Sequence, residues 1–148
     1  MSARINSRVV TFDPDTQKVL LVRNKDQDYW YPPGGGWEPG EEDIRTCGER
    51  EVAEETGQRV TIQRLIYTQQ FQASPEVIFL EWFWLAHPDG DTKIRDGHID
   101  LHGIVAEARW FSSEELQSVK VFPKRLKTTF WDNLSRWNQD EDPFLGVS

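Results

Sequence analysis

The chain lacks the features that direct proteins into disulfide frameworks, nucleic-acid complexes or membranes. Its single cysteine, Cys47, excludes an intramolecular disulfide and a cysteine-rich zinc site. Its formal net charge of −8 argues against a general nucleic-acid binder, which needs a basic surface. No apolar run approaches the ~20 residues of a membrane span, and the first ten residues are too polar for a secretory signal. We therefore expect a cytoplasmic protein that binds neither nucleic acid nor membranes.

The rest of the composition is ordinary for a globular domain. Hydrophobic residues make up 37% of the chain and charged residues 28%. A chain of 148 residues is long enough to bury a core of its own. We predict one domain over residues 1–148, with a C-terminal tail at about residues 139–148. Cys47 is expected to be a small core residue, since free cysteine is usually buried.

A glycine-rich turn leading into an acidic helix is the most informative segment. Gly34, Gly35 and Gly36 follow two prolines, a combination that excludes a regular element and predicts a rigid turn close to a ligand. A helix is predicted over residues 43–56, because Gly57 suits the position just after a helix end.

One face of this helix combines small residues with carboxylates. Each helical residue advances about 100°, which places these on one stripe: Ile44, Cys47, Gly48, Glu51 and Glu55. Glu54 lies beside the last two, and carboxylates at i, i+3 and i+4 repel one another. A cation is therefore expected there, and Mg²⁺ or Mn²⁺ suits oxygen ligands. The alternative is a solvated acidic helix face.

The residues around this helix have the spacing of a known motif. Gly36 is followed after five residues by Glu42, and after seven more by REVAEETG at residues 50–57. This pattern, ending at Gln58, resembles the box of the Nudix hydrolases. Gln58 replaces an aliphatic residue of the family, with Val60 as the candidate for its packing role.

A second departure concerns the turn before the helix. The Gly-Glu pair of the family corresponds here to Gly40-Glu41, one residue early relative to the helix. Glu41 and Glu42 therefore compete for the same role, and a one-residue insertion in the turn is expected.

The resemblance implies an α/β fold, specifically an α/β/α sandwich with a mixed β-sheet. It also implies Mg²⁺-dependent hydrolysis of a diphosphate bond in a nucleoside diphosphate linked to another moiety. Nucleoside triphosphates, ADP-ribose and nucleotide sugars are the substrate types, Mn²⁺ is an alternative cation, and a homodimer is possible by resemblance alone. The alternative function is a non-catalytic Nudix-like domain that binds a nucleotide or a partner as a sensor.

Carried over to matching positions, the resemblance makes Glu51, Glu54 and Glu55 metal ligands. The carbonyl of Gly35, or of Gly34 if the insertion lies elsewhere, would complete the metal site. Glu51 is the candidate for taking a proton from the attacking water.

The remaining box residues are expected to support the site. Arg50 is predicted to orient a carboxylate, with Glu54 or Glu42 as its partner. Glu42 (or Glu41) would support the loop and the helix, or bind metal through water.

The substrate pocket is suggested by aromatic residues, which can stack on a base. Trp37, Tyr31 and Phe71 are the candidates for substrate binding. Tyr29, Trp30 and Trp82 are further aromatic residues on or near the motif.

Two further acids have open roles. Glu81 interrupts an apolar strand and belongs either to an edge facing water or to the site. Glu107 is either a surface residue or an additional acid of the site. A transition-metal site at His98, Asp100 and His102 is a separate hypothesis, based on their i, i+2 and i+4 spacing in an extended segment.

Alternation, apolar runs and turn residues predict the other elements. Strands are expected over residues 4–12, 18–23, 60–71, 77–86 and 106–111. A capping box at Ser112 and Glu115 predicts a helix over residues 112–119. A last helix is expected over residues 124–137, with an apolar stripe of Leu126, Phe130, Leu134 and Trp137.

Overall fold

The protein is described by a computed structural model that covers residues 1–40, 42–95, 98, 100 and 103–148. Its strands are β1 (Ser2–Asp13), β2 (Lys18–Asn24), β3 (Tyr29–Trp30), β4 (Gly34–Gly36), β5 (Val60–Ser74), β6 (Val77–Pro88), β7 (Val105–Ser112) and β8 (Lys120–Val121). Its helices are α1 (Ile44–Thr56), α2 (Ser113–Leu116), the 3₁₀ turn η1 (Lys124–Lys127) and α3 (Thr129–Trp137).

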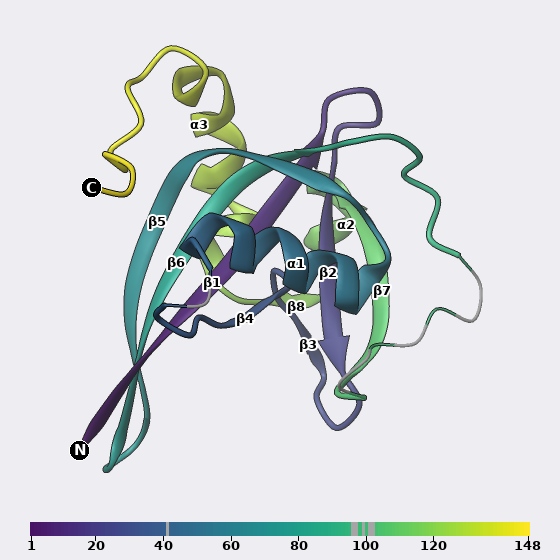
Figure 1. The fold of residues 1–148 in the computed structure, drawn as a ribbon. Helices are drawn as coiled ribbons and strands as arrows, with labels where there is room; N and C mark the ends of the chain where they lie inside the picture. The colour runs from purple at the N-terminus through teal and green to yellow at the C-terminus, as the bar shows by residue number, and fades with distance from the viewer. Residues whose placement is uncertain (41, 96–97, 99, 101–102) are drawn as a thin grey trace.

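The main sheet is mixed, as predicted. Its strands run in the order β5-β6-β1-β2-β7, and β4 pairs with β1 off this path (Figure 1). Strands β1 and β6 are parallel, whereas the other pairs in this sheet are antiparallel. A small second sheet joins β3 to β8 in parallel.

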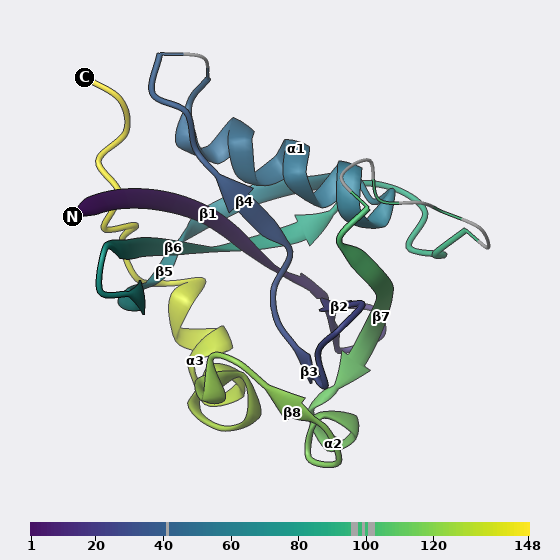
Figure 2. The same ribbon diagram turned by 90° about the horizontal axis from the view of Figure 1, so that it is seen from below.

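Helices cover both faces of the main sheet, so the predicted α/β/α sandwich is confirmed. Figure 2 shows α1 on one side of β1, β5 and β6, with α3 on the other side. Each layer has its own core. Val52 of α1 packs with Val9, Leu20 and Trp84 of the sheet, and Phe130 and Trp137 of α3 pack with Val10 and Phe83. Within the described ranges, no helix is both long and apolar enough to cross a membrane.

Helix α1 ends at Thr56 as predicted and begins one residue later than predicted, because Asp43 is its N-cap. The side chain of Asp43 accepts a hydrogen bond from the backbone N–H of Arg45, and Gly57 closes the helix with φ 75°. Cys47 is fully buried, and burial raises the pKa of its thiol to about 12. At Gly48 a Cβ would lie 2.9 Å from side-chain atoms of β1, so glycine lets the helix pack closely on the sheet.

The last predicted helix is split in two, so the prediction of one helix over residues 124–137 is wrong. The chain forms η1 and then α3, separated by Thr128 with φ −132° and ψ −99°. The break allows Leu126, Phe130 and Trp137 to be buried in one core, and the indole N–H of Trp131 donates to the carbonyl of Leu126. The apolar stripe therefore packs on the domain itself.

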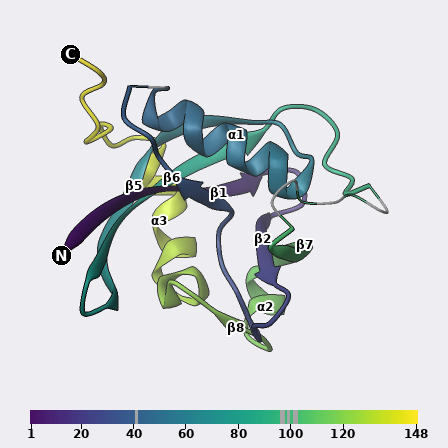
Figure 3. The same ribbon diagram turned by 60° about the horizontal axis from the view of Figure 1, so that its bottom comes forward.

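The C-terminal residues lie against the domain beside the loop that precedes α1 (Figure 3). The ring of Phe144 packs edge-on against Trp84, with ring centroids 5.0 Å apart, and also contacts Trp82. The guanidinium of Arg45 lies over the Phe144 ring, 5.0 Å from its centroid. Residues 139–148 thus include one anchored aromatic side chain that extends the core under α1.

Replacing Phe144 with alanine is expected to destabilise the protein by about 1–2 kcal/mol, because a half-buried aromatic ring loses its packing against two tryptophans. The melting temperature should fall by about 3–6 °C for a chain of this size. Leu145→Ala is the matched control, since Leu145 is 95% exposed. Equal melting temperatures for the two variants would show that the Phe144 contact contributes nothing.

Candidate functional site

Two carboxylates of α1, those of Glu51 and Glu55, contact the glycines of strand β4. Glu51 and Glu55 are both buried, each with 8% exposure. The backbone N–H of Gly34 donates to Glu55 Oε2 at 2.8 Å. A Cβ added at Gly35 would lie 2.6 Å from Glu51 Cδ, so the Glu51 carboxylate rests directly on this glycine. The prediction of a rigid turn at Gly34–Gly36 is wrong, because these glycines form strand β4 and pair with β1. This strand brings its backbone into contact with two of the three proposed metal ligands.

Arg50 connects the remaining carboxylates. Its Nη2 lies 2.7 Å from Glu42 Oε1, and its Nη1 lies 3.0 Å from Glu54 Oε1 and 3.3 Å from Glu51 Oε1. Both partners considered for Arg50 from the sequence, Glu54 and Glu42, are thus bound at once. These contacts raise the pKa of Arg50 above its ordinary value, Glu42 being the largest cause. The arginine thus links Glu42, which precedes α1, to two carboxylates of the helix itself.

Glu55 is held in an unfavourable environment for a charge. Burial, and secondarily the charge of Glu51, raise the pKa of Glu55 from 4.5 to about 8, although the Gly34 N–H and Arg8 act in the opposite direction. The carboxylate of Asp100, itself buried, adds to the repulsion. A cation at this position would relieve both causes of the raised pKa.

The donor set suits a hard divalent cation. Glu51, Glu54 and Glu55 supply carboxylate oxygens from the C-terminal half of one helix, and the backbone of Gly35 lies directly against the Glu51 carboxylate. The close approach at Gly35 is the feature that fits, since a side chain there would occupy the space of the carboxylate. Among the described residues, no three acidic, histidine or cysteine side chains already converge on a single point.

The three aromatic candidates lie in different surroundings. Trp37 packs in the core under α1, and its indole N–H donates to the carbonyl of Glu42 at 2.6 Å. The guanidinium of Arg8 lies over the Tyr31 ring, 5.2 Å from the ring centroid. Burial raises the pKa of Tyr31 to about 12. Phe71 is 52% exposed and stacks on Phe79 at 6.2 Å.

Glu81 is a buried residue of an inner strand. Strand β6 lies between β5 and β1, so the interpretation of Glu81 as an edge residue facing water is wrong. Its Oε2 lies 2.6 Å from Arg8 Nε and also accepts from Asn6, while its Oε1 accepts from Gln69 at 2.8 Å. These partners, Arg8 above all, hold its pKa below the ordinary value against the effect of burial.

The other candidate acid and the proposed transition-metal residues have separate partners. Glu107 is more exposed and pairs with Arg23 at 3.6 Å across β2 and β7. Asp100 accepts hydrogen bonds from the backbone N–H groups of residues 104 and 105, and His98 Nε2 lies 3.1 Å from the carbonyl of Glu54. Two residues named from the sequence, Glu41 and His102, lie outside the described residues.

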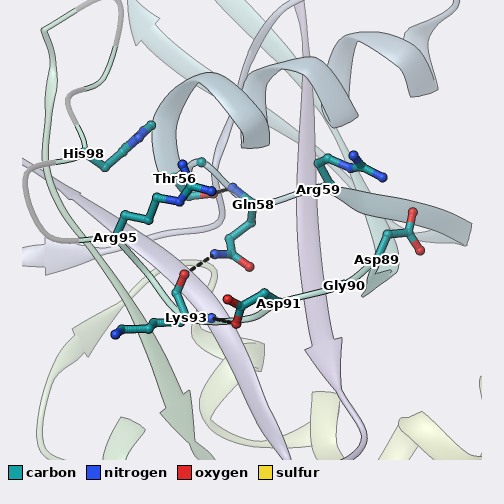
Figure 4. A pocket seen from close by; sticks show the side chains of 10 residues that line it. Thr56, Gln58, Arg59, Asp89, Gly90, Asp91, Lys93, Arg95 and His98 are labelled. Atoms are coloured by element: carbon teal, nitrogen blue, oxygen red, sulfur yellow. Dashed lines mark hydrogen bonds between the residues drawn. The ribbon is translucent and has the colours of Figure 1, made fainter.

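Gln58, the unusual last residue of the motif, lines a pocket of about 310 Å³ beyond the end of α1 (Figure 4). Its Nε2 donates to the carbonyl of Lys93, while Val60 is buried in the core under α1. Figure 4 shows the side chain of Arg95 running toward Thr56, while those of Arg59 and Lys93 point outward on opposite sides. Neither Glu51 nor Glu55 lines it, so it is separate from the carboxylate cluster.

Arg8, Asn6 and Asp100 are the residues near the site that the sequence did not single out for this role. Arg8 and Asn6 reach it through the pairing of β1 with β4 and β6, which joins residues distant in sequence. The sequence signal that could have identified Arg8 is a charged residue directly before the apolar pair Val9 and Val10. The corresponding signal for Asp100 is a lone acid among apolar and histidine residues.

Comparisons with known proteins agree with this geometry. The family described as NUDIX domain matches residues 3–132. Nucleoside diphosphate-linked moiety X motif 6 of Mus musculus is 47% identical over 66 residues, which are 43% of this chain and 21% of that protein. The human protein of the same name is 42% identical over 66 residues, with the same coverage. The match thus spans about a fifth of these curated relatives.

Solved structures share the fold. A NUDIX hydrolase from Nitrosomonas europaea superposes with a TM-score of 0.70 at 21% identity, covering 91% of this chain and 90% of that one. A structure described as a UDP-X diphosphatase has a TM-score of 0.68 at 18% identity, covering 96% of this chain and 66% of that one. At these identities the likeness concerns the fold.

Proposed function

The chain belongs to the Nudix family, and on this premise we propose that it hydrolyses the diphosphate linkage of a nucleoside diphosphate joined to another moiety. The observation that carries the proposal is the contact of the β4 glycines with two carboxylates in the C-terminal half of α1. The N–H of Gly34 binds Glu55, and Gly35 lies directly against the carboxylate of Glu51. A backbone packed this closely on two carboxylates suits a metal site more than a solvated helix face.

Glu51, Glu54, Glu55 and the carbonyl of Gly35 would hold the cation, with Mg²⁺ as the expected ion and Mn²⁺ as the alternative. When bound, the cation supplies charge neutralisation of the phosphates and an acidified water. Arg50 Nη1 lies 3.3 Å from Glu51 Oε1 and 3.0 Å from Glu54 Oε1. To bind a cation, these two carboxylates would exchange their contacts with Arg50 for contacts with the metal. Arg50 keeps Glu42 as its closest partner throughout.

The chain's own groups also prepare the attack of water. Glu51, fixed between Gly35 and Arg50, is the residue that would accept the proton from the attacking water at its carboxylate. The buried positions of Glu51 and Glu55 exclude bulk water, which strengthens every electrostatic interaction with the developing charge. Trp37 supports the arrangement by fixing the backbone of Glu42.

The nucleoside is expected on the sheet face that carries Tyr31 and Phe71. Phe71 pairs with Phe79, two positions along β6 from Glu81 and therefore on the same sheet face, opposite α1. Tyr31 contacts the guanidinium of Arg8, which Glu81 binds. The exposed ring of Phe71 is available for stacking on a base, a contact typically worth about 1–3 kcal/mol. Tyr31 is covered by Arg8, so its part would be to position that guanidinium.

A panel of nucleotides incubated with Mg²⁺ should contain one compound that releases a nucleoside monophosphate. The panel includes nucleoside triphosphates, ADP-ribose, dinucleoside polyphosphates, NADH, and UDP- and ADP-sugars, with products separated by anion-exchange chromatography. Excess EDTA is expected to abolish turnover, because the carboxylates alone cannot neutralise the phosphates. Added Mn²⁺ should restore it.

The outcome that contradicts this proposal is equally definite. Tight binding of a panel compound with no cleavage in Mg²⁺ or Mn²⁺ would favour the sensor function instead. Cleavage that persists in EDTA and in a Glu54→Gln/Glu55→Gln variant would point to a contaminating enzyme. The same purified variant therefore serves as the control for both results.

A further inference from the structure

A row of polar side chains crosses the sheet between two aromatic rows on the face opposite α1. Gln69, Glu81 and Asn6 stand opposite one another on β5, β6 and β1. The row on one side contains Tyr67 and Phe83 from the core under α3. The row on the other side is the stacked pair of Phe71 and Phe79.

The guanidinium of Arg8 is bound by the carboxylate of Glu81. Its Nε donates to Glu81 Oε2 at 2.6 Å, and its Nη1 approaches the carbonyl of Pro32 at 3.4 Å. The ring of Tyr31 covers one face of the guanidinium. A guanidinium has five N–H donors, so these two bonds leave three N–H groups for another acceptor. The Arg8 side chain is 19% exposed, which leaves it accessible to a ligand.

The network around Glu81 is costly as a purely structural device. Its carboxylate is buried and uses three donors, from Arg8, Asn6 and Gln69, to offset the loss of water. Apolar side chains of similar volume usually serve a sheet face as well or better than a buried ion pair. The aromatic rows on both sides show that this face accepts apolar residues. The network therefore fixes the position of the Arg8 guanidinium more than it stabilises the sheet.

Arg8 lies beside the carboxylate cluster. It pairs with Gly34 across β1 and β4, and a Cβ at Gly34 would lie 2.6 Å from Arg8 Cα and 2.9 Å from Arg8 Cγ. The N–H of the same glycine donates to Glu55. Gly34 thus contacts both Arg8 and the proposed metal ligand Glu55. The charge of Arg8 acts to lower the pKa of the Glu55 carboxylate.

We propose that Arg8 binds a phosphate oxygen of the diphosphate substrate through its remaining N–H groups, and that Glu81 is the residue that positions it. This inference rests on the proposed function for the identity of the ligand. Guanidinium groups bind phosphate oxygens through paired, charge-assisted hydrogen bonds, which makes a fixed orientation valuable. Glu81 is accordingly a positioning residue and not an acid of the reaction.

Calorimetric titration of Mg²⁺-loaded protein with two uncleavable probes tests the proposal without requiring turnover. The probes are α,β-methylene-ADP and methylenediphosphonate, which carries only the P–C–P unit. Arg8→Gln should weaken binding of both probes by about 10–100-fold, as expected for lost hydrogen bonds to a charged group. Glu81→Gln should weaken binding by about 3–10-fold. The double variant should be no weaker than Arg8→Gln alone, because Glu81 acts through Arg8.

Lys124→Gln is the control, since Lys124 is an exposed cation of η1 and its loss changes the net charge equally. It should bind both probes within about twofold of the wild type. Arg8→Lys keeps the charge but loses the planar fork, and provides a second test if Arg8→Gln folds poorly.

Three results would overturn the assignment: unchanged binding in Arg8→Gln, weaker binding of the nucleotide probe alone, or no binding of either probe by the wild type. A protein that binds both probes through Arg8 yet cleaves no nucleotide would refute the proposed hydrolysis and leave the Arg8 assignment intact.

Discussion

Glu55→Gln is expected to lower kcat by about 10²–10³-fold in Mg²⁺, the loss typical of removing one preorganised electrostatic group from a buried site. The amide keeps the shape of the side chain and can still accept the N–H of Gly34, now at 2.8 Å from Glu55 Oε2. It cannot contribute a negative charge to a cation. Steady-state kinetics on whichever panel compound is cleaved, over a range of Mg²⁺ concentrations, measures the effect.

The same substitution should stabilise the protein in EDTA. Burial raises the pKa of Glu55 from 4.5 to about 8, so the folded state disfavours the charged carboxylate. This group's contribution to stability is fully present below pH 4.5 and is lost as pH rises through about 8. Glutamine avoids that loss, and we expect a gain of about 1–3 kcal/mol at pH 7. Thermal melts in EDTA at pH 5 and pH 8 should diverge for the wild type more than for the variant.

Opposite changes in activity and stability identify a residue retained for function. Glu114→Gln is the control, because Glu114 is an exposed residue of α2 remote from the cluster. It should change neither kcat nor the melting temperature. A Glu55→Gln protein that is less stable in EDTA and fully active in Mg²⁺ would show that Glu55 is a structural residue and that the metal site lies elsewhere.

Local patterns in the sequence predicted the acidic helix and its C-terminal cap. Gly57 and the buried stripe of α1 follow from helical periodicity and capping chemistry, which depend on residues within a few positions of one another. The contact of Arg50 with Glu54 is of the same kind, at i and i+4. Such features can be derived before any tertiary structure is known.

The parts that could not be derived depend on strand register. Arg8 and Glu81 are 73 positions apart and meet because β1 and β6 pair in parallel with Asn6 opposite Glu81. A shift of one residue in that register would place Arg8 on the face of α1. The split of the last helix at Thr128 has a similar origin, since the packing of Leu126 and Phe130 in one core decides it. In each case tertiary packing overrides the local pattern.

The three adjacent glycines of β4 should respond differently to alanine, and Gly35→Ala is expected to lower kcat/KM by about 10²–10³-fold. A Cβ at Gly35 would lie 2.6 Å from Glu51 Cδ and 2.7 Å from its Oε1. These atoms belong to the end of a flexible side chain, so the carboxylate can move away at little cost to stability. The displaced carboxylate then loses the position from which it would bind metal and accept a proton.

Alanine at Gly34 and at Gly36 distinguishes this effect from a general intolerance of alanine in β4. At Gly36 the nearest atom to a Cβ is Asn6 Oδ1 at 4.0 Å, so Gly36→Ala should retain activity within about twofold. At Gly34 a Cβ would lie 2.2 Å from the carbonyl oxygen of Ser7, which is backbone and cannot yield. Gly34→Ala should therefore lower the melting temperature as well as activity. If Gly35→Ala instead keeps full activity, or loses as much stability as Gly34→Ala, then the close approach of Gly35 to Glu51 serves packing and not catalysis.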